Sequence, residues 1–365
     1  MRSGTLAKAL ILLLTTKNLY SQPVLIARLD SFFHTLPTTQ PGIALSIDMN
    51  GEPIYRNTAG IADISTGTPL DTQTNFRMAS LTKQFTAMAI LLLEKDGALT
   101  VDDHIGRWLP ELPPHIGQTV LIRHLLTHCS GILDYESLIP AGQTTQLLDA
   151  DVLQLLAAHD STYFPPGARF QYSNSGFCLL ALIIERASHK PYARFIKERL
   201  FLPLHMDSST VYQAGQPIPH RAMGYARDSA GQVLPSDQSV TSATKGDGGV
   251  YTSLSDYAKW IKALQHNTLI PLAATLRRLR FPIGPNSFYA AGWFLRTDAP
   301  QLLFHSGNTC GFANFVIQLP GDNWSITYFS NIADNESPFR EILRLLQQNG
   351  YPDLSSVFHL HDLTR

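Results

Sequence analysis

The sequence has few cysteines, few charged residues and no long hydrophobic run beyond its first residues. Three cysteines in 365 residues, without paired spacing, predict no disulfide framework. Charged residues make up 16% and the formal net charge is −1, so the chain has no basic surface with which to track phosphates. The apolar runs 87–93 and 177–184 are too short to span a bilayer. These absences disfavour nucleic-acid binding and a transmembrane anchor in the body of the chain.

The N-terminus holds the one targeting candidate. Arg2 and Lys8 precede the apolar run 9–14, and Ser21 is a small residue at a plausible cleavage point. We expect residues 1–21 to be an export signal, which would place the protein in the periplasm or outside the cell. The alternative is a cytoplasmic protein whose first helix is frayed and uncleaved.

Strand patterns lie near both ends of the chain, and helical patterns lie between them. Asn50-Gly51 is a strong hairpin signal, and it joins two alternating stretches. The expected strands are 43–49, 52–57, 289–296, 301–305, 313–319 and 324–330. The expected helices are 25–36, 80–95, 122–127, 149–159, 174–188, 192–200, 254–265 and 338–348.

This order predicts an α/β (α+β) fold in which both chain ends build one antiparallel sheet flanked by helices. A helical lobe is inserted into that layer. We assign residues 22–350 to one domain, and residues 351–365 to a C-terminal tail. Within the domain, 22–75 and 245–350 form the α/β lobe and 76–244 the mainly helical lobe. The boundary between the lobes is a cleft, where a small ligand is expected to bind.

The first chemical motif is Ser80-Leu81-Thr82-Lys83, at the expected start of a helix. Spacing of i, i+3 places Ser80 and Lys83 on one helix face. A cationic amine lowers the cost of forming an alkoxide, and a neutral amine accepts the hydroxyl proton instead. Either role requires lysine and not arginine, because the arginine guanidinium does not give up its proton at working pH. The alternative is an incidental Ser-x-x-Lys at a solvent-facing helix start.

Two further motifs follow in the chain. Tyr172-Ser173-Asn174 lies at the entry to the helix 174–188, where a phenol can move protons and an amide can orient a substrate. In isolation the tripeptide is better explained by a helix-capping Ser or Asn and a packed aromatic, and only its pairing with Ser80 favours the catalytic interpretation. His305-Ser306-Gly307 enters a strand, and a glycine there lets the strand approach a substrate backbone closely.

The three motifs, in this order, resemble those of the serine β-lactamase and penicillin-binding-protein superfamily. The branch is that of class C β-lactamases, D,D-peptidases and related esterases, and the resemblance covers roughly residues 30–348. It implies that Ser80 is the nucleophile and that Lys83 and Tyr172 transfer protons. It also implies that Asn174 orients the substrate, and that the backbone amides of Ser80 and Asn308 form the oxyanion hole.

His305 departs from the lysine that the family usually places there. Lysine supplies a permanent cation for a substrate carboxylate, whereas histidine is largely neutral near pH 7. Efficient β-lactam turnover is therefore in doubt, although peptidases and esterases of the family carry histidine at this position. We expect a serine acyl hydrolase acting on a β-lactam, a D-amino-acid peptide or an ester. A protein that is acylated but turns over slowly is the alternative.

No cofactor motif is present, and a metal site is not expected. His124 and His128 have i, i+4 spacing but lack an evident third ligand, so capping and packing explain them better. The expected partner is a small-molecule or peptide substrate. The oligomeric state and the acyl group that is preferred stay open.

Overall fold

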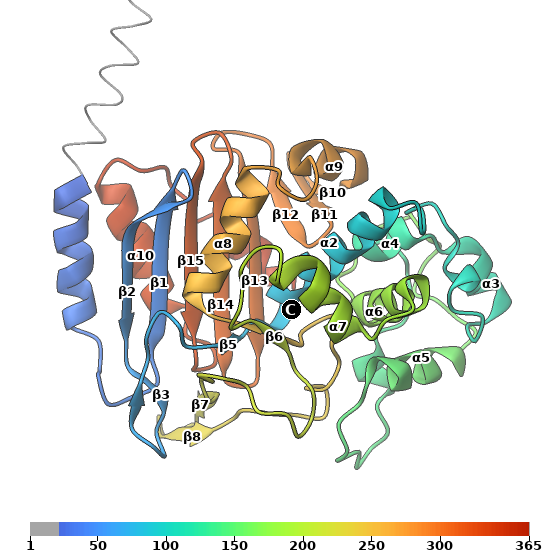
Figure 1. The fold of residues 1–365 in the computed structure, drawn as a ribbon, viewed down its shortest axis with the longest axis horizontal. Helices are drawn as coiled ribbons and strands as arrows, with labels where there is room; N and C mark the ends of the chain where they lie inside the picture. Colours follow the sequence, from blue (N-terminus) through green and yellow to red (C-terminus); the bar gives the residue numbers. More distant parts are fainter. Residues whose placement is uncertain (1–21, 365) are drawn as a thin grey trace, which may run out of the picture.

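An eight-stranded antiparallel sheet organises the structure, a computed structural model that describes residues 22–364. The strand order is β10-β11-β12-β13-β14-β15-β1-β2, so the two chain ends meet where β15 pairs with β1 (Figure 1). The strands are β1 Ile43–Met49, β2 Glu52–Ala59, β10 Phe281–Gly284, β11 Ser287–Ala290, β12 Trp293–Arg296, β13 Leu302–Thr309, β14 Phe312–Leu319 and β15 Trp324–Ser330. The predicted fold class is confirmed.

Helices cover both faces of the sheet. One face packs against a helix at residues 22–34, α10 Ser337–Gln348 and α11 Val357–Asp362, which share a buried apolar cluster with the strands. The other face packs against α8 Leu254–Gln265 and the helical lobe through a second, larger cluster. α9 Leu272–Leu279 contacts β11 near the edge of the sheet.

The helical lobe lies beside the sheet, on the right in Figure 1. Its helices are α2 Thr82–Lys95, α3 Pro114–Thr119, α4 Ile122–Leu126, α5 Asp149–Ala157, α6 Asn174–Ser188 and α7 Tyr192–Ile196, which continues into a π-helical turn at Lys197–Phe201. Short 3-10 turns occur at Ala79–Leu81, Ile105–Arg107 and Tyr135–Leu138. The small strands are β3 Ile61–Asp63, β4 Thr68–Pro69, β5 Phe76–Arg77, β6 Thr210–Val211, β7 Tyr225–Arg227, β8 Val233–Pro235 and β9 Val250–Thr252.

One strand prediction is wrong. The stretch 289–296 was expected to be continuous, yet it contains a hairpin between β11 and β12. The turn residues Ala291 and Gly292 have φ values of 46° and 85°, a left-handed backbone that reverses the chain. Residues 288–295 form an unbroken apolar run that includes this turn, so the sequence pattern alone did not reveal the turn.

The N-terminal segment is not part of the described structure, whereas the C-terminal segment is packed on the sheet. The expected export signal, 1–21, lies outside the described residues. The segment assigned to a tail contains α11, whose Val357, Phe358 and Leu360 are buried against the sheet.

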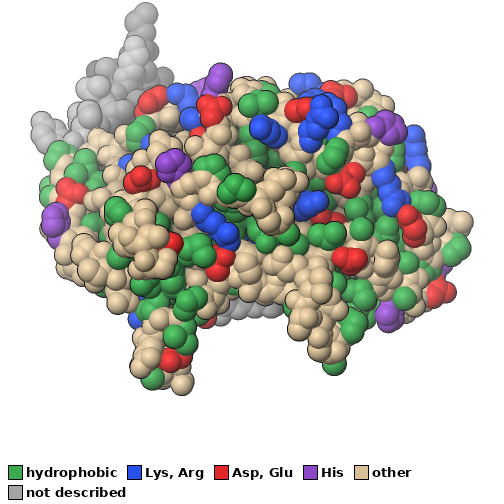
Figure 2. All heavy atoms as spheres, turned by 60° about the horizontal axis from the view of Figure 1, so that its bottom comes forward, with side chains coloured by type: hydrophobic (Ala, Val, Ile, Leu, Met, Phe, Trp, Pro, Cys, Tyr) green, Lys and Arg blue, Asp and Glu red, His purple; other side chains and the backbone are tan. Residues whose placement is uncertain are grey.

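Among residues 22–364, no helix has the length and apolar character needed to cross a membrane. Figure 2 shows basic and acidic side chains interspersed on one face of the molecule.

Candidate active site

Ser80 lies in the 3-10 turn that leads into α2, at the meeting point of the sheet and the helical lobe. It is partly exposed, while its neighbours Ala79 and Leu81 are buried. Ala79 has φ of 49°, a left-handed conformation that costs a non-glycine residue about 1 kcal/mol or more. The strain is localised next to the serine, and it turns the Ser80 side chain out of the core.

Lys83 is fully buried and its amine makes three hydrogen bonds. Nζ lies 2.8 Å from Ser80 Oγ, 2.8 Å from Asn174 Oδ1 and 3.0 Å from the backbone oxygen of Asp247. Asn174 Nδ2 donates to Glu136 Oε1 at 2.9 Å, which fixes the amide so that its oxygen faces the lysine. A continuous chain therefore runs from Ser80 through Lys83 and Asn174 to Glu136.

The loop that presents the Asp247 oxygen to Lys83 is held from two sides. Thr86 Oγ1 of α2 donates to the oxygen of Gly246 at 2.6 Å. The Asp149 carboxylate, at the start of α5, accepts the backbone N–H groups of Lys245 and Gly246 at 3.0–3.2 Å. Burial, and then the nearby Asp247 charge, raise the pKa of Asp149 to about 7.

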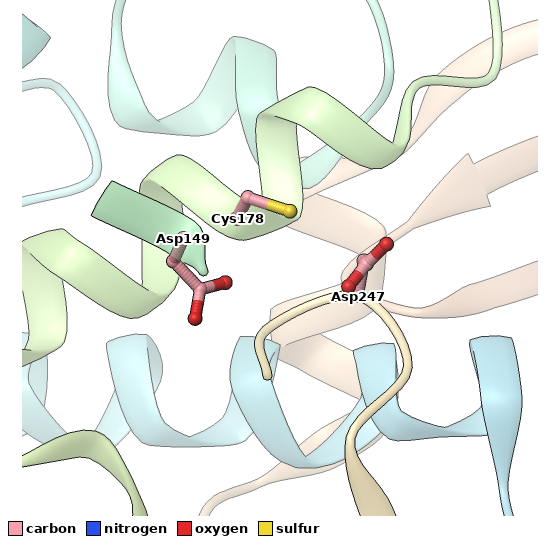
Figure 3. Close-up of side chains that lie close together, drawn as sticks. All are labelled: Asp149, Cys178 and Asp247. Carbon is pink, nitrogen blue, oxygen red and sulfur yellow. The ribbon is translucent and has the colours of Figure 1, made fainter. Parts of the chain in front are cut away.

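Asp149, Cys178 and Asp247 form a buried cluster beside this loop (Figure 3). One possible ligand atom from each residue lies within 4.8 Å of the other two, which is close enough for the three to share a metal ion. Burial raises the pKa of the Cys178 thiol well above its ordinary value, so it stays protonated. The Asp149 oxygens already accept backbone N–H groups. The donor set therefore suits a shared proton better than a metal ion.

The Tyr172 ring lies beside Lys83, but its hydroxyl is not bonded to the serine. Lys83 Nζ is 4.9 Å from the ring centroid, a cation–π contact. The Tyr172 ring also packs against His128, with centroids 4.3 Å apart and ring planes tilted by 35°. The Tyr172 hydroxyl is buried and has no hydrogen-bond partner among the described residues. Its predicted role in proton transfer stays a prediction.

His128 is a buried component of the site that the sequence did not reveal. Its Nδ1 accepts the backbone N–H of Ser173 at 3.0 Å, which positions the Tyr172–Asn174 segment. Burial, and then the Lys83 charge, lower its pKa well below the ordinary value, so the ring is neutral. His124 Nδ1 likewise accepts a backbone N–H, from Leu121 at 3.1 Å. Both histidines thus have packing and capping contacts.

β13 forms the opposite side of the site and touches the serine turn at Gly307. A Cβ atom at Gly307 would lie 2.2 Å from the Met78 oxygen and 3.2 Å from the Ser80 nitrogen. Only glycine permits this approach. Asn314 Nδ2 of β14 donates to the oxygens of Arg77 and Gly307, at 2.9 and 3.3 Å, and so ties the strand to the turn.

His305 is buried among aromatic side chains, with its ring 6.1 Å from the Tyr172 ring, and it is not among the residues that line the cleft. Its Nδ1 lies 2.6 Å from the Ser306 oxygen and its Nε2 lies 3.0 Å from the Tyr289 hydroxyl. These partners assign the proton to Nδ1, so Tyr289 donates to Nε2. Burial is the main cause that lowers the pKa of His305 to about 3. His305 is therefore a neutral residue with no charge to offer a substrate.

Ser306 and Asn308 contact a residue that the sequence analysis missed. Ser306 Oγ lies 2.8 Å from His361 Nδ1, and Asn308 Nδ2 lies 3.3 Å from His361 Nε2. Ser306 is buried, whereas Asn308 is exposed and lines the cleft. His361 belongs to α11, in the segment expected to be a tail.

A small cleft opens at Ser80. It has a volume of about 70 Å³, and its lining includes Ser80, Glu136, Asn174, Asp247 and Asn308. Burial, followed by the nearby acidic side chains, raises the pKa of Glu136. The structure thus brings Ser80, Lys83, Asn174 and the β13 segment together around one cleft, with the Tyr172 ring beside them.

Comparison with known proteins gives a consistent assignment. The Beta-lactamase family model matches residues 29–349. Penicillin-binding protein 4* of Bacillus subtilis (strain 168) is 33% identical over 337 residues, which cover 87% of this chain and 74% of the relative.

Two solved structures share the fold. The octameric penicillin-binding protein homologue from Pyrococcus abyssi has a TM-score of 0.75 and 23% identity, covering 91% of this chain and 78% of that chain. D-amino acid amidase from Ochrobactrum anthropi SV3 has a TM-score of 0.72 and 23% identity, covering 91% of this chain and 99% of that chain.

Proposed function

This chain belongs to the beta-lactamase family of serine hydrolases, and from that premise we propose that it cleaves amide or ester bonds through an acyl-enzyme on Ser80. The observation that carries the proposal is the 2.8 Å contact between Lys83 Nζ and Ser80 Oγ. Two bonding directions of the amine are taken by the oxygens of Asn174 and Asp247. The third direction is left for the serine.

Acylation begins when Ser80 Oγ attacks the substrate carbonyl carbon. The new bond forms as the hydroxyl proton leaves toward Lys83, or toward Tyr172 beside it. The carbonyl oxygen becomes an oxyanion, held by the backbone amides of Ser80 and Asn308. When the carbon–nitrogen or carbon–oxygen bond breaks, the proton that Ser80 released passes to the leaving group through the Tyr172 hydroxyl, which has no hydrogen-bond partner among the described residues. Water then cleaves the acyl–Ser80 ester by the reverse proton path.

The neutral sheet side of the cleft favours substrates that do not depend on a carboxylate next to the scissile bond. His305 carries no charge, because burial lowers its pKa, and it is not among the residues that line the cleft. We therefore favour D-amino-acid amides, peptides and simple esters over β-lactams as good substrates. The amidase with the same fold gives a precedent for amide hydrolysis.

The test is a panel of p-nitrophenyl esters, D-amino-acid amides and peptides, and a chromogenic cephalosporin. We expect turnover of at least one class, and a loss of about 10³-fold or more in the Ser80→Ala variant. Unchanged turnover in that variant would rule out the mechanism.

A penicillin-binding or sensing role is the second candidate, because the 33% identical relative is named a penicillin-binding protein. Acylation would use the same residues, and the difference would lie in release. A burst of one equivalent of product followed by slow release would support this role, whereas sustained turnover would support a hydrolase.

We further propose that the protein is exported. The support is the pattern of the first 21 residues alone: two basic residues before an apolar run, and a small residue at the end of the segment. Sequencing the N-terminus of the protein purified from its own host tests this proposal. A mature chain that begins at Met1 would contradict it.

A further inference from the structure

The C-terminal helix α11 brings one side chain to the catalytic strand. His361 lies 2.8 Å from Ser306 Oγ through Nδ1, and 3.1 Å from Glu336 Oε1 and 3.3 Å from Asn308 Nδ2 through Nε2. We propose that His361 is a positioning residue, which holds the end of β13 in the geometry that acylation of Ser80 requires. This inference rests on the proposed function.

The contact is built into the core. His361 is 1% exposed and Ser306 is 1% exposed. The His361 ring meets the Phe315 ring of β14 edge-on, with centroids 5.3 Å apart. Three apolar neighbours in α11, Val357, Phe358 and Leu360, are buried in the cluster on this face of the sheet. A buried polar ring on a docked helix has few alternative rotamers, so its hydrogen bonds fix the strand firmly.

Glu336 sets the direction of the hydrogen bonds. Its carboxylate lies at the start of α10 and accepts from Nε2, which places the ring proton on that nitrogen. Nδ1 is then an acceptor, and the Ser306 hydroxyl donates to it. Nε2 and Asn308 Nδ2 are both donors in this arrangement, so their 3.3 Å approach is a packing contact and not a hydrogen bond. The chain Ser306–His361–Glu336 thus joins β13, α11 and α10, across sequence separations of 55 and 25 residues.

The position of the Ser306–His361–Glu336 chain explains why catalysis should depend on it. Ser306 and Asn308 flank Gly307, which touches the Ser80 turn. The Asn308 amide is one of the two proposed oxyanion donors, and Asn308 lines the cleft. A displacement of β13 by a fraction of an ångström would change the distance between this donor and the oxyanion. Ground-state binding depends less on that distance, so kcat should suffer more than KM.

The experiment compares His361→Ala, His361→Asn and the matched control His359→Ala in the full chain. His359 lies in the same helix but is exposed. We expect His361→Ala to lower kcat roughly 10- to 100-fold with KM within about threefold. His361→Asn keeps a polar atom near the Nδ1 position and should recover most of the loss. His359→Ala should match the wild type.

A double-mutant cycle separates positioning from a general loss of stability. If His361 acts through Ser306, the losses of kcat in His361→Ala and Ser306→Ala will not add in the double variant. Thermal melting of each variant is recorded alongside. If His361→Ala fails to fold, His361→Asn and Ser306→Ala carry the same comparison.

Two results would overturn the proposal: an unchanged kcat in the folded His361 variants, or losses that add and merely follow the melting temperature. Failure of the proposed function is a different outcome, because the wild-type activity would then persist in Ser80→Ala.

Discussion

The two walls of the cleft differ in charge and in hydrogen bonding. The helical wall, formed by Ser80, Lys83, Asn174 and Glu136, contains the charges and is linked by hydrogen bonds of 2.8–2.9 Å. The sheet wall, formed by His305–Asn308 of β13, is neutral, because the pKa of its histidine is lowered to about 3. Under the proposed mechanism, the helical wall supplies reactivity, while the sheet wall supplies shape.

The walls also differ in how their parts are held. Ser80 and Lys83 are one helical turn apart, so local geometry brings them together. The sheet wall depends on partners from distant segments: Tyr289 for His305, and His361 for Ser306. Changes in the helical wall should therefore remove the chemistry, whereas changes in the sheet wall should alter geometry. The four predictions below test this difference.

The largest effect is expected for Lys83→Met. Methionine fills a similar buried volume but cannot exchange a proton with Ser80 or donate to Asn174. Activity should fall about 10³-fold or more, as for loss of a nucleophile's partner. Steady-state kinetics on the best substrate of the panel measure it. Lys95→Met, at an exposed position of the same helix, is the control. A loss below tenfold in Lys83→Met would contradict the role given to the helical wall.

Gly307→Ala should have the next largest effect. The new methyl group would meet the Met78 oxygen at 2.2 Å, so either β13 or the serine turn must move. We expect kcat/KM to fall about 100-fold, the scale of a 1 Å misplacement. Gly321→Ala is the matched control, because a Cβ atom there has no neighbour within 4 Å. Equal activity of the two variants would show that the close approach is not needed.

Asp149→Asn tests the contribution of the Asp149 carboxyl, which holds the loop next to Lys83, through the pH dependence of stability. The pKa of Asp149 is about 7 in the folded protein, against about 3.9 when unfolded. The folded state therefore holds the extra proton between these values, and this group makes the free energy of unfolding fall as pH rises from about 4 to 7. The variant lacks that contribution, so its free energy of unfolding should depend less on pH.

Chemical denaturation at pH 5 and pH 8 measures the difference. The exposed Asp322→Asn variant is the control, and it should retain the wild-type pH dependence. An identical pH dependence in Asp149→Asn and the wild type would be evidence that this carboxyl does not titrate in the range.

His305→Gln should have the smallest effect. Glutamine is neutral, as His305 is above about pH 4, and its amide can still accept from the Tyr289 hydroxyl. We expect kcat/KM within about fivefold of the wild type, and the same pH profile from pH 5 to 8. Loss of the acid limb of the profile in the variant would mean that His305 becomes charged during the reaction.

The sequence predicted what depends on local spacing. The strand 43–49, the helix 174–188 and the closeness of Ser80 and Lys83 follow from short-range patterns, and the structure has each of them. The hairpin within 289–296 was missed because the apolar run continues through Ala291 and Gly292 without a polar turn residue.

The sequence did not predict contacts between residues that are far apart along the chain. His361 is 55 residues from Ser306, and Asp149 is 96 residues from Lys245. Neither pairing leaves a periodic or spacing signal, because each arises only when the helices pack on the sheet. The orientation of Tyr172, with its ring beside Lys83, likewise depends on packing against His128.

The claim that Ser80 becomes acylated is tested most directly by mass spectrometry of the protein quenched during turnover of its best ester or amide substrate. The account predicts a mass increase equal to the acyl group, located by peptide mapping on Ser80 and absent from the Ser80→Ala variant. An adduct on another residue, or continued turnover without any adduct in quenched and stopped-flow samples of both proteins, would contradict it.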